Sequence, residues 1–477
     1  MESYMNFRKI RIAACLCAAA LVVTSAAFGQ MGRRWPSEKK VVPDPVTGLP
    51  LTFLTSTDGG YRQSKIYQTH RQWTADGKWL VFRGTRETGS QVFAVNEETG
   101  DIVQVTETGF SGMPCVGNKT MKLFVLAGGG GSGSGPGATA APAAAAAPAD
   151  DRGPGGRGSG AGGPRQILEI DLARLFADVA AGTVKPAANY QRVCGTIPPT
   201  LEADGNMGLD ANDDFMYFRV TGPETARLSE GQTLQPGFGP RARQSTSGLR
   251  SMNLKTGEIG FIANVGFQIG HVQTNPWMPG EIVFCWETTG KAPQRTWIVR
   301  SDGTGLRPLY PEAPYEWITH EAVIGKDEVV LAILGHRQVA SATPNSNWGI
   351  AGSMEHPTGV AIVNLRTREM RIVGQVPVWA PGRSDWHVAG SADGRWAAND
   401  DFSYEVWLID RHSGEMNLLA GPQKAGADHI HPTFNAEGTK IEIQSALISK
   451  DGRSLNICIV PVPKTWLNRT YSNKAPE

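Results

Sequence analysis

Short β-rich runs that end in tight glycine-containing turns recur along most of the chain, and this repeat constrains the fold more than any other feature. Turns of the Asp-Gly type join neighbouring strands into antiparallel hairpins. The phrases return about every 40–50 residues, which is the period of one β-propeller blade. Examples are Asp76-Gly77, Thr99-Gly100, Asp302-Gly303, Asp393-Gly394, Ser413-Gly414 and Glu437-Gly438.

Counting the repeats from the strands near Ile66 predicts an all-β fold with about seven blades. A two-sheet sandwich is the main competitor, but a chain of 477 residues would need several of them. A single β-propeller over residues 51–466 is therefore the better prediction. Residues 30–50 are then an N-terminal extension, and residues 467–477 are a C-terminal tail.

Two segments do not follow the repeat. Residues 127–165 are a run of Gly, Ala, Pro and Ser. This composition cannot bury a core, so it predicts a disordered insertion inside one blade. Residues 1–29 combine a basic start, an apolar run from Ile12 to Val23 and a small-residue exit before Gln30. This is the pattern of a secretory signal peptide, so we expect a periplasmic or secreted protein.

The bulk charge and the cysteines exclude several classes of protein. The formal net charge is +1, so the chain lacks the basic excess typical of nucleic-acid binding or of attachment to an anionic membrane. Four cysteines remain beyond the leader, and their wide spacing resembles neither a disulfide framework nor a CxxC metal site. We expect buried thiols at Cys115, Cys194, Cys285 and Cys458.

Histidine is scarce, with 9 residues in the chain, so its placement is informative. A single histidine is more often a satisfied core residue than a ligand. Five repeats, however, begin with an imidazole at a similar phase, which predicts a functional, metal-binding cluster around the central channel. These residues are His70, His271, His320, His387 and the pair His429 and His431, whose side chains share one strand face. The remaining three, His336, His356 and His412, share no such phase and are expected in loops or at the surface.

Several pieces of the sequence resemble, in order and approximate spacing, the oligogalacturonate lyases, a family of propeller enzymes that cleave short pectic fragments by β-elimination. The Thr-His-Glu and His-x-His-Pro pieces together are more specific than the repeat phrases, which many propellers share. The resemblance covers most of the chain outside the insertion. The pieces are Thr74-Ala75-Asp76-Gly77-Lys78, Gly270-His271, Ile282-Val283-Phe284-Cys285, Asp302-Gly303, Thr319-His320-Glu321 and His429-Ile430-His431-Pro432-Thr433-Phe434.

The resemblance implies that His320, His429 and His431 are ligands of a divalent ion, typically manganese. It also implies that His271 is the catalytic base.

Three family positions differ in this chain. Gly426 stands where the family has a glutamine as fourth ligand, and Gln423 is nearby. The assisting arginine of the family would fall near Gly248. Arg250 comes two residues later and points to the same face of the strand, so it is the candidate for that place by sequence. Trp286 stands where the family usually has a histidine.

The implied chemistry suits these residue types. Elimination from a uronate removes the C5 proton next to a carboxylate and expels the O4 substituent. A cation on that carboxylate stabilises the transition state, and a neutral imidazole is a suitable base. The ion and an arginine are expected to keep His271 unprotonated. Glu321 is a candidate partner that orients a ligand histidine. Candidate substrate contacts are His387, His70, Arg62 and Lys65.

The leading hypothesis is a metal-assisted lyase that acts on uronate-containing oligosaccharides, without a nucleic-acid or membrane partner. An alternative is a non-catalytic propeller that binds a ligand and keeps the histidines as a structural metal site. A propeller attached to a serine hydrolase is disfavoured, because the sequence lacks a G-x-S-x-G elbow and a following α/β domain.

Overall fold

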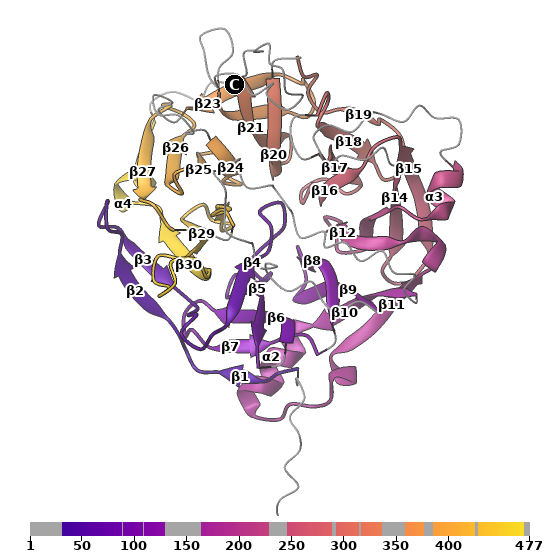
Figure 1. Ribbon diagram of the computed structural model, residues 1–477, viewed down its shortest axis with the longest axis horizontal. Helices are drawn as coiled ribbons and strands as arrows, with labels where there is room; N and C mark the ends of the chain where they lie inside the picture. The colour runs from indigo at the N-terminus through magenta and orange to yellow at the C-terminus, as the bar shows by residue number, and fades with distance from the viewer. Residues whose placement is uncertain are drawn as a thin grey trace, which may run out of the picture.

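Seven antiparallel sheets form a ring in the computed structural model, so the protein is a seven-bladed β-propeller, as predicted (Figure 1). The structure describes residues 31–87, 89–107, 109–128, 164–228, 246–288, 292–313, 316–335, 358–375, 385–424 and 428–471. The predicted leader and the histidines at 336 and 356 lie outside these residues.

Each blade follows the chain outward from the centre of the ring, and its first strand is the innermost. Blade 1 contains β4 (Arg62–Lys65), β5 (Trp79–Arg86), β6 (Gly89–Asn96) and β7 (Ile102–Gln104). Blade 2 contains β8 (Phe110–Val116), β9 (Lys122–Gly128), β10 (Arg165–Asp171) and β11 (Gln191–Ile197). Blade 3 contains β12 (Ala203–Leu209), β13 (Phe215–Val220), β14 (Ser247–Asn253) and β15 (Ile259–Val265).

The next three blades repeat this order. Blade 4 contains β16 (Ile269–Thr274), β17 (Glu281–Trp286), β18 (Thr296–Arg300) and β19 (Arg307–Pro308). Blade 5 contains β20 (Glu316–Gly325), β21 (Glu328–Gly335), β22 (Gly359–Asn364) and β23 (Met370–Gly374). Blade 6 contains β24 (Asp385–Gly390), β25 (Trp396–Asp401), β26 (Val406–Asp410) and β27 (Met416–Ala420).

Blade 7 closes the ring with strands from both ends of the propeller. The C-terminal strands β28 (Thr433–Phe434), β29 (Lys440–Ser445) and β30 (Asn456–Pro461) are followed in the sheet by β3 (Pro50–Phe53) and β2 (Lys40–Pro43). β1 (Arg34–Trp35) pairs with β7 at the outer edge of blade 1. Residues 34–43 therefore supply outer strands to two blades, and these strands cover edges that would otherwise be open.

The insertion after residue 127 does not separate two blades. β9 and β10 are neighbours in blade 2, where Ala127 pairs with Gln166 and Gly128 pairs with Arg165. The strands that flank the insertion are thus neighbours in the sheet of one blade. Residues 129–163 themselves lie outside the described part of the chain.

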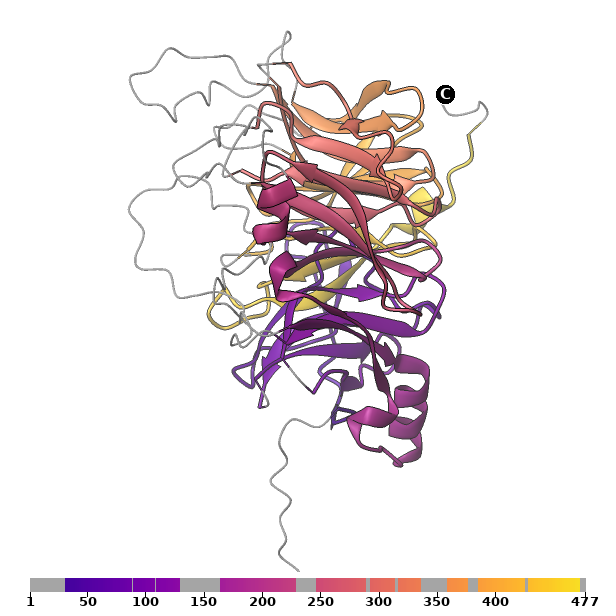
Figure 2. The same cartoon turned by 90° about the vertical axis from the view of Figure 1, so that its right-hand side faces the viewer.

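Among the residues that the structure describes, helices are few and short. The longest described helix, α2 (Leu172–Ala181), begins at Asp171, whose side chain accepts a hydrogen bond from Arg174 N, and ends at Gly182. It lies at the rim of the ring, where Phe176 stacks on Trp79 of blade 1 (Figure 2). The others are α3 (Pro223–Leu228), α4 (Lys464–Leu467) and the 3₁₀ turns Ala187–Asn189 and Pro199–Leu201. Among the described residues, no helix has the length and hydropathy to cross a membrane.

Candidate functional site

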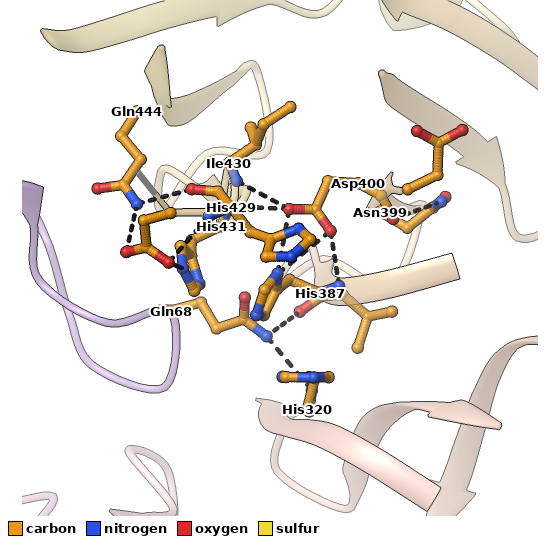
Figure 3. A network of polar contacts seen from close by, with 12 residues as sticks. Gln68, His320, His387, Asn399, Asp400, His429, Ile430, His431 and Gln444 are labelled. Carbon is orange, nitrogen blue, oxygen red and sulfur yellow. Dashed lines mark hydrogen bonds and ion pairs between the residues drawn. The ribbon is translucent and has the colours of Figure 1, made fainter. Parts of the chain in front are cut away.

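Four histidine rings from three neighbouring blades meet near the axis of the ring, and we call them the central imidazole cluster: His320, His387, His429 and His431 (Figure 3). His387 lies in the middle. Its ring centroid is 4.1 Å from that of His320, 5.1 Å from that of His429 and 3.8 Å from that of His431. His271 adjoins the cluster, with its ring centroid 6.4 Å from that of His320.

Irregular backbone at the innermost strands directs these side chains. His271 in β16 and His320 in β20 lie where the pairing register shifts, and their φ angles are 47° and 54°. His431, just before β28, has a φ of 55°. A non-glycine residue in this left-handed region costs about 1–3 kcal/mol, and such strain is concentrated at functional sites. β-Bulges also redirect side chains next to active sites.

The same irregularity in blades 2 and 3 is built from glycine. Gly112 in β8 and Gly205 in β12 have φ angles of 69° and 88° and lie at equivalent register shifts. A Cβ on Gly205 would lie only 2.7 Å from Gly112 Cα, so no side chain fits where these two strands meet. In blades 4, 5 and 7 the equivalent position holds a histidine. The imidazoles therefore lie on the side of the axis that faces these blades.

A protein group holds one ring nitrogen in three members of the cluster. The Tyr67 hydroxyl lies 3.1 Å from His320 Nδ1, Asp428 Oδ1 lies 3.1 Å from His431 Nε2, and Asp400 Oδ2 lies 3.1 Å from His387 Nδ1. Partners of this kind fix the tautomer and orientation of metal-binding histidines.

Asp400 of β25 organises the cluster. Its carboxylate accepts hydrogen bonds from the backbone N–H groups of His387 (2.7 Å), Ile430 (2.9 Å) and His431 (3.2 Å), and so joins blade 6 to the His429-Ile430-His431 segment. Burial alone would raise the pKa of Asp400, but the His387 imidazole and its hydrogen bond lower it to about 2. Asp400 is therefore an anion at any ordinary pH.

The connection between β4 and β5 crosses the centre of the ring (Figure 1). The Tyr67 ring centroid is 4.9 Å from that of His271 and 5.1 Å from that of His431. Gln68 Nε2 donates to the carbonyls of His320 and Val388 at 3.3 and 3.2 Å. This segment therefore packs against four blades and supports the cluster from within.

His70 belongs to the same connection but lies apart from the cluster. Its Nε2 lies 2.7 Å from the carbonyl oxygen of Met207 in blade 3, and its Nδ1 lies 2.8 Å from the Thr69 hydroxyl. Burial lowers the pKa of His70 to about 4. Both ring nitrogens are thus occupied by protein groups, which gives His70 a structural position.

The cluster fits a divalent metal. Ligand atoms of His387, Asp400 and His429 lie within 4.8 Å of one another. The Nδ1 atoms of His429 and His431 are buried and have no hydrogen-bond partner among the described residues. Burial, and then the neighbouring His387, lower the pKa of His429 to about 4 and lower that of His431 as well. Neutral imidazole is the form that binds metal.

The expected ligands His320, His429 and His431 all belong to the cluster, but the compact set of ligand atoms includes His387, which was predicted to contact substrate. Residue 426 lies outside the described part of the chain. Gln423 is not free to serve as the fourth ligand. Its amide contacts Asp44, Gly421 and Ser445.

His271 lies against two carboxylates. Its Nδ1 lies 3.2 Å from Glu321 Oε1 and its Nε2 lies 3.6 Å from Glu287 Oε2. Burial lowers the pKa of His271, but the adjacent Cys285 and Glu321 raise it well above the usual 6.5. Of these two, we ascribe the rise to the carboxylate, because burial raises the pKa of Cys285 to about 12 and keeps it a neutral thiol. The metal-free protein therefore favours the imidazolium. Glu321 does orient a histidine, but this histidine is His271.

The three predicted cationic residues lie outside the cluster. Arg250 is on β14, the third strand of its blade, where it stacks on Phe261 and donates to the carbonyl of Leu249. Lys65 is buried, and its ammonium binds His431 O at 2.6 Å, Thr433 Oγ1 at 2.7 Å and Glu442 at 3.3 Å. These contacts use the three donors of Lys65. Arg62 is an exposed residue at the start of β4.

Sequence reasoning missed Tyr67, Asp400, Asp428 and Arg295. The Asn399-Asp400-Asp401 run carried a signal, because three consecutive polar residues at the end of an apolar strand are unusual unless their partners are buried with them. Arg295 is buried, 3.9 Å from Glu287 and 3.8 Å from Glu321. No local pattern marks it.

Fold and site together define a seven-bladed β-propeller with a buried polyhistidine centre near its axis. Solved structures that share this fold include two oligogalacturonate lyases. One is an oligogalacturonate lyase in complex with manganese, at 17% identity, covering 92% of this chain and 100% of the other, with a TM-score of 0.65. The second is an oligogalacturonate lyase from Vibrio parahaemolyticus, at 17% identity, 91% and 100% coverage and a TM-score of 0.63.

The resemblance drawn from the sequence thus agrees with structural similarity, which at this identity establishes the shared fold. No protein-family model matches the chain, and neither does any curated protein.

Proposed function

We propose that this protein is a metal-assisted polysaccharide lyase that cleaves uronate-containing oligosaccharides by β-elimination. The observation that carries the proposal is the convergence of four imidazoles and His271 beside one another in a propeller with the fold of oligogalacturonate lyases.

The central imidazole cluster would hold a divalent ion, with manganese as the candidate. When bound, such an ion supplies Lewis-acid stabilisation to a carboxylate that gains charge in the transition state. Residues around the cluster would hold the ligand rings in place. Asp400, Asp428 and Tyr67 orient the rings that would bind it.

His271 is the proposed base. The Glu321 carboxylate accepts a hydrogen bond from Nδ1–H of His271 and so leaves Nε2 to take the C5 proton from the sugar. The imidazole must be neutral for this step. Because Glu321 raises the pKa of His271, it shifts activity to higher pH, and it stabilises the imidazolium once that forms. Arg295 replaces Arg250 as the proposed assisting cation, because it lies beside both carboxylates that contact His271.

The test is an absorbance assay for the unsaturated uronyl ends that elimination creates, with oligogalacturonate as substrate. We expect activity in the parent protein and its loss with a chelator. His271→Ala should lower the rate by about 10²–10⁴-fold with the metal still bound. His412→Ala is the matched control. His412 packs against Tyr471 and is no member of the cluster, so this variant should retain full activity.

Full activity of His271→Ala would remove this residue from the mechanism. The deep burial of the rings also suits the alternative of a non-catalytic propeller with a structural metal site, since His320 is 0% exposed. That alternative predicts metal binding and sugar binding without any increase in absorbance.

A further inference from the structure

A second group of potential ligands lies beside the central imidazole cluster, and we call it the Cys285 group: His271, Cys285 and Glu287. Its three ligand atoms lie within 4.8 Å of one another. Glu287 Oε2 is 3.6 Å from His271 Nε2 and 3.5 Å from Cys285 Sγ. His271 and Cys285 are buried, and the Glu287 side chain is 19% exposed.

The pairing of β16 with β17 builds this group. Gly270 pairs directly with Cys285, and the register shift that follows turns His271 toward the same side. A Cβ on Gly270 would lie 2.6 Å from Glu287 Oε2 and 3.0 Å from Cys285 Sγ. The absent side chain is therefore what lets the Glu287 carboxylate fold back over the thiol.

The spacing and donor set are those of a tetrahedral metal site. Zinc bonds of about 2.0–2.3 Å place neighbouring tetrahedral ligands roughly 3.3–3.8 Å apart. The separations of Glu287 Oε2 from Cys285 Sγ and from His271 Nε2, 3.5 and 3.6 Å, fall in this range. In addition, the Glu321 carboxylate lies 3.2 Å from His271 Nδ1, which is the carboxylate–histidine arrangement that supports metal-binding imidazoles.

A thiol among the ligands favours a soft divalent ion over a hard one. Arg295 adds one positive charge beside Glu287 and Glu321, and a thiolate would add a second anionic ligand. Burial raises the pKa of Cys285 to about 12, so the free thiol is protonated and poorly suited to act as a nucleophile. Metal binding would form bonds to Cys285 Sγ, His271 Nε2 and a Glu287 oxygen, and would release the S–H proton and the Nε2 proton of the imidazolium to solvent.

We propose that His271, Cys285 and Glu287 form a second divalent-metal site, selective for a thiophilic ion of the zinc class and distinct from the central imidazole cluster. Three protein ligands leave one tetrahedral position open for water or a substrate oxygen. A metal on His271 Nε2 removes the atom that the proposed lyase uses as a base. The site therefore inhibits that reaction, and this consequence rests on the proposed function.

Cobalt(II) titration of the metal-free, full-length protein tests the site without any assay of activity. Cobalt bound to a thiolate has a near-ultraviolet charge-transfer band that cobalt bound only to imidazole and carboxylate lacks. We expect the band in the parent protein and its loss in Cys285→Ser, which should also bind one fewer equivalent of metal. Cys194→Ser, at another buried free cysteine, is the matched control and should keep the band.

Glu287→Gln keeps the thiol and alters a partly exposed residue, so it tests the site even if Cys285→Ser folds poorly. Its thiolate band should need at least about tenfold more cobalt. A parent protein without the band, a band that survives Cys285→Ser, or unchanged cobalt affinity in Glu287→Gln would overturn the proposal.

The inhibitory consequence has a separate readout. Zinc should inhibit the lyase activity of the parent protein at a concentration at least about tenfold lower than that needed for Glu287→Gln, each relative to its own zinc-free rate. If the parent shows no lyase activity, the proposed function fails while the cobalt band still decides the metal site. Equal zinc sensitivity in both proteins would overturn the inhibitory role.

Discussion

At the scale of single residues, this site depends on imidazoles in a backbone conformation that glycine normally takes. His271, His320 and His431 all have positive φ angles, whereas Gly112 and Gly205 take the corresponding positions in blades 2 and 3. Replacing such a histidine with alanine keeps the strain and removes only the ring. Histidine-to-alanine variants at these positions therefore report on function more than on folding.

The His271–Glu321 pair yields a pH prediction for the proposed lyase. A base must be unprotonated, and Glu321 helps to raise the pKa of His271, so the rate should increase with pH through a value above 6.5. Glu321→Gln removes that charge, lowers the pKa of His271 and should move this acidic limb to lower pH. The pH dependence of kcat/KM measures the shift.

Glu258→Gln is the control for this series, because Glu258 is an exposed carboxylate in the turn after β14. Its acidic limb should coincide with that of the parent protein. A limb that stays in place in Glu321→Gln would show that another group limits the rate.

At the scale of elements, the innermost strands position the ligands and the β4–β5 connection locks them together. Lys65 at the end of β4 joins blade 1 to blade 7, because its ammonium binds Glu442 of β29 and the carbonyl of His431. Burial lowers the pKa of Lys65 and raises that of Glu442 to about 7, so desolvation outweighs their mutual attraction for both groups. Keeping both groups charged in the interior costs free energy, and leaving one of them charged without its partner costs more.

Removing one partner should therefore destabilise the protein far more than removing both. Lys65→Met leaves Glu442 buried without its cation and should lower the free energy of unfolding by about 3–5 kcal/mol. The double variant Lys65→Met/Glu442→Leu should recover most of that loss. Chemical denaturation of both, with Lys78→Met in an exposed turn as a near-neutral control, measures the difference. Equal losses in the single and double variants would contradict this account.

At the scale of the whole molecule, the ring holds together because an N-terminal strand completes the last blade. Phe53 of β3 pairs with Cys458 of β30 and is fully buried in the core of blades 6 and 7. A ring without this closure would expose the edge of β30 and separate the first and last blades. The site depends on this closure, since Tyr67 of blade 1 contacts His431 of blade 7.

Phe53→Ala should accordingly lower the free energy of unfolding by about 3–5 kcal/mol through the cavity it leaves. Val41→Ala, on the adjoining strand β2 but 63% exposed, should change it by less than about 0.5 kcal/mol. Thermal or urea unfolding compares the two. A small effect of Phe53→Ala would mean that β3 adds little to ring closure.

The sequence alone determined the architecture, because the alternation of strands and turns is local and its period is that of a blade. It also singled out the histidines of the central imidazole cluster and His271, but it grouped with them His70, which lies in the β4–β5 connection. The helical period of Leu172, Leu175, Phe176 and Val179 was equally visible, but it is a single helix in an otherwise β-rich pattern and was missed.

Only the tertiary structure decided how the side chains meet. The central position of His387, the bridging role of Asp400 and the pairing of Glu321 with His271 depend on register shifts and on φ angles that no spacing rule contains. Arg250 lies on the third strand of its blade, outside the cluster, whereas Arg295, which lies beside Glu287 and Glu321, precedes β18 in a loop. The position of a residue in its sequence repeat predicts its height along the axis of the ring. Which side chains it contacts depends on how the blades pack against one another.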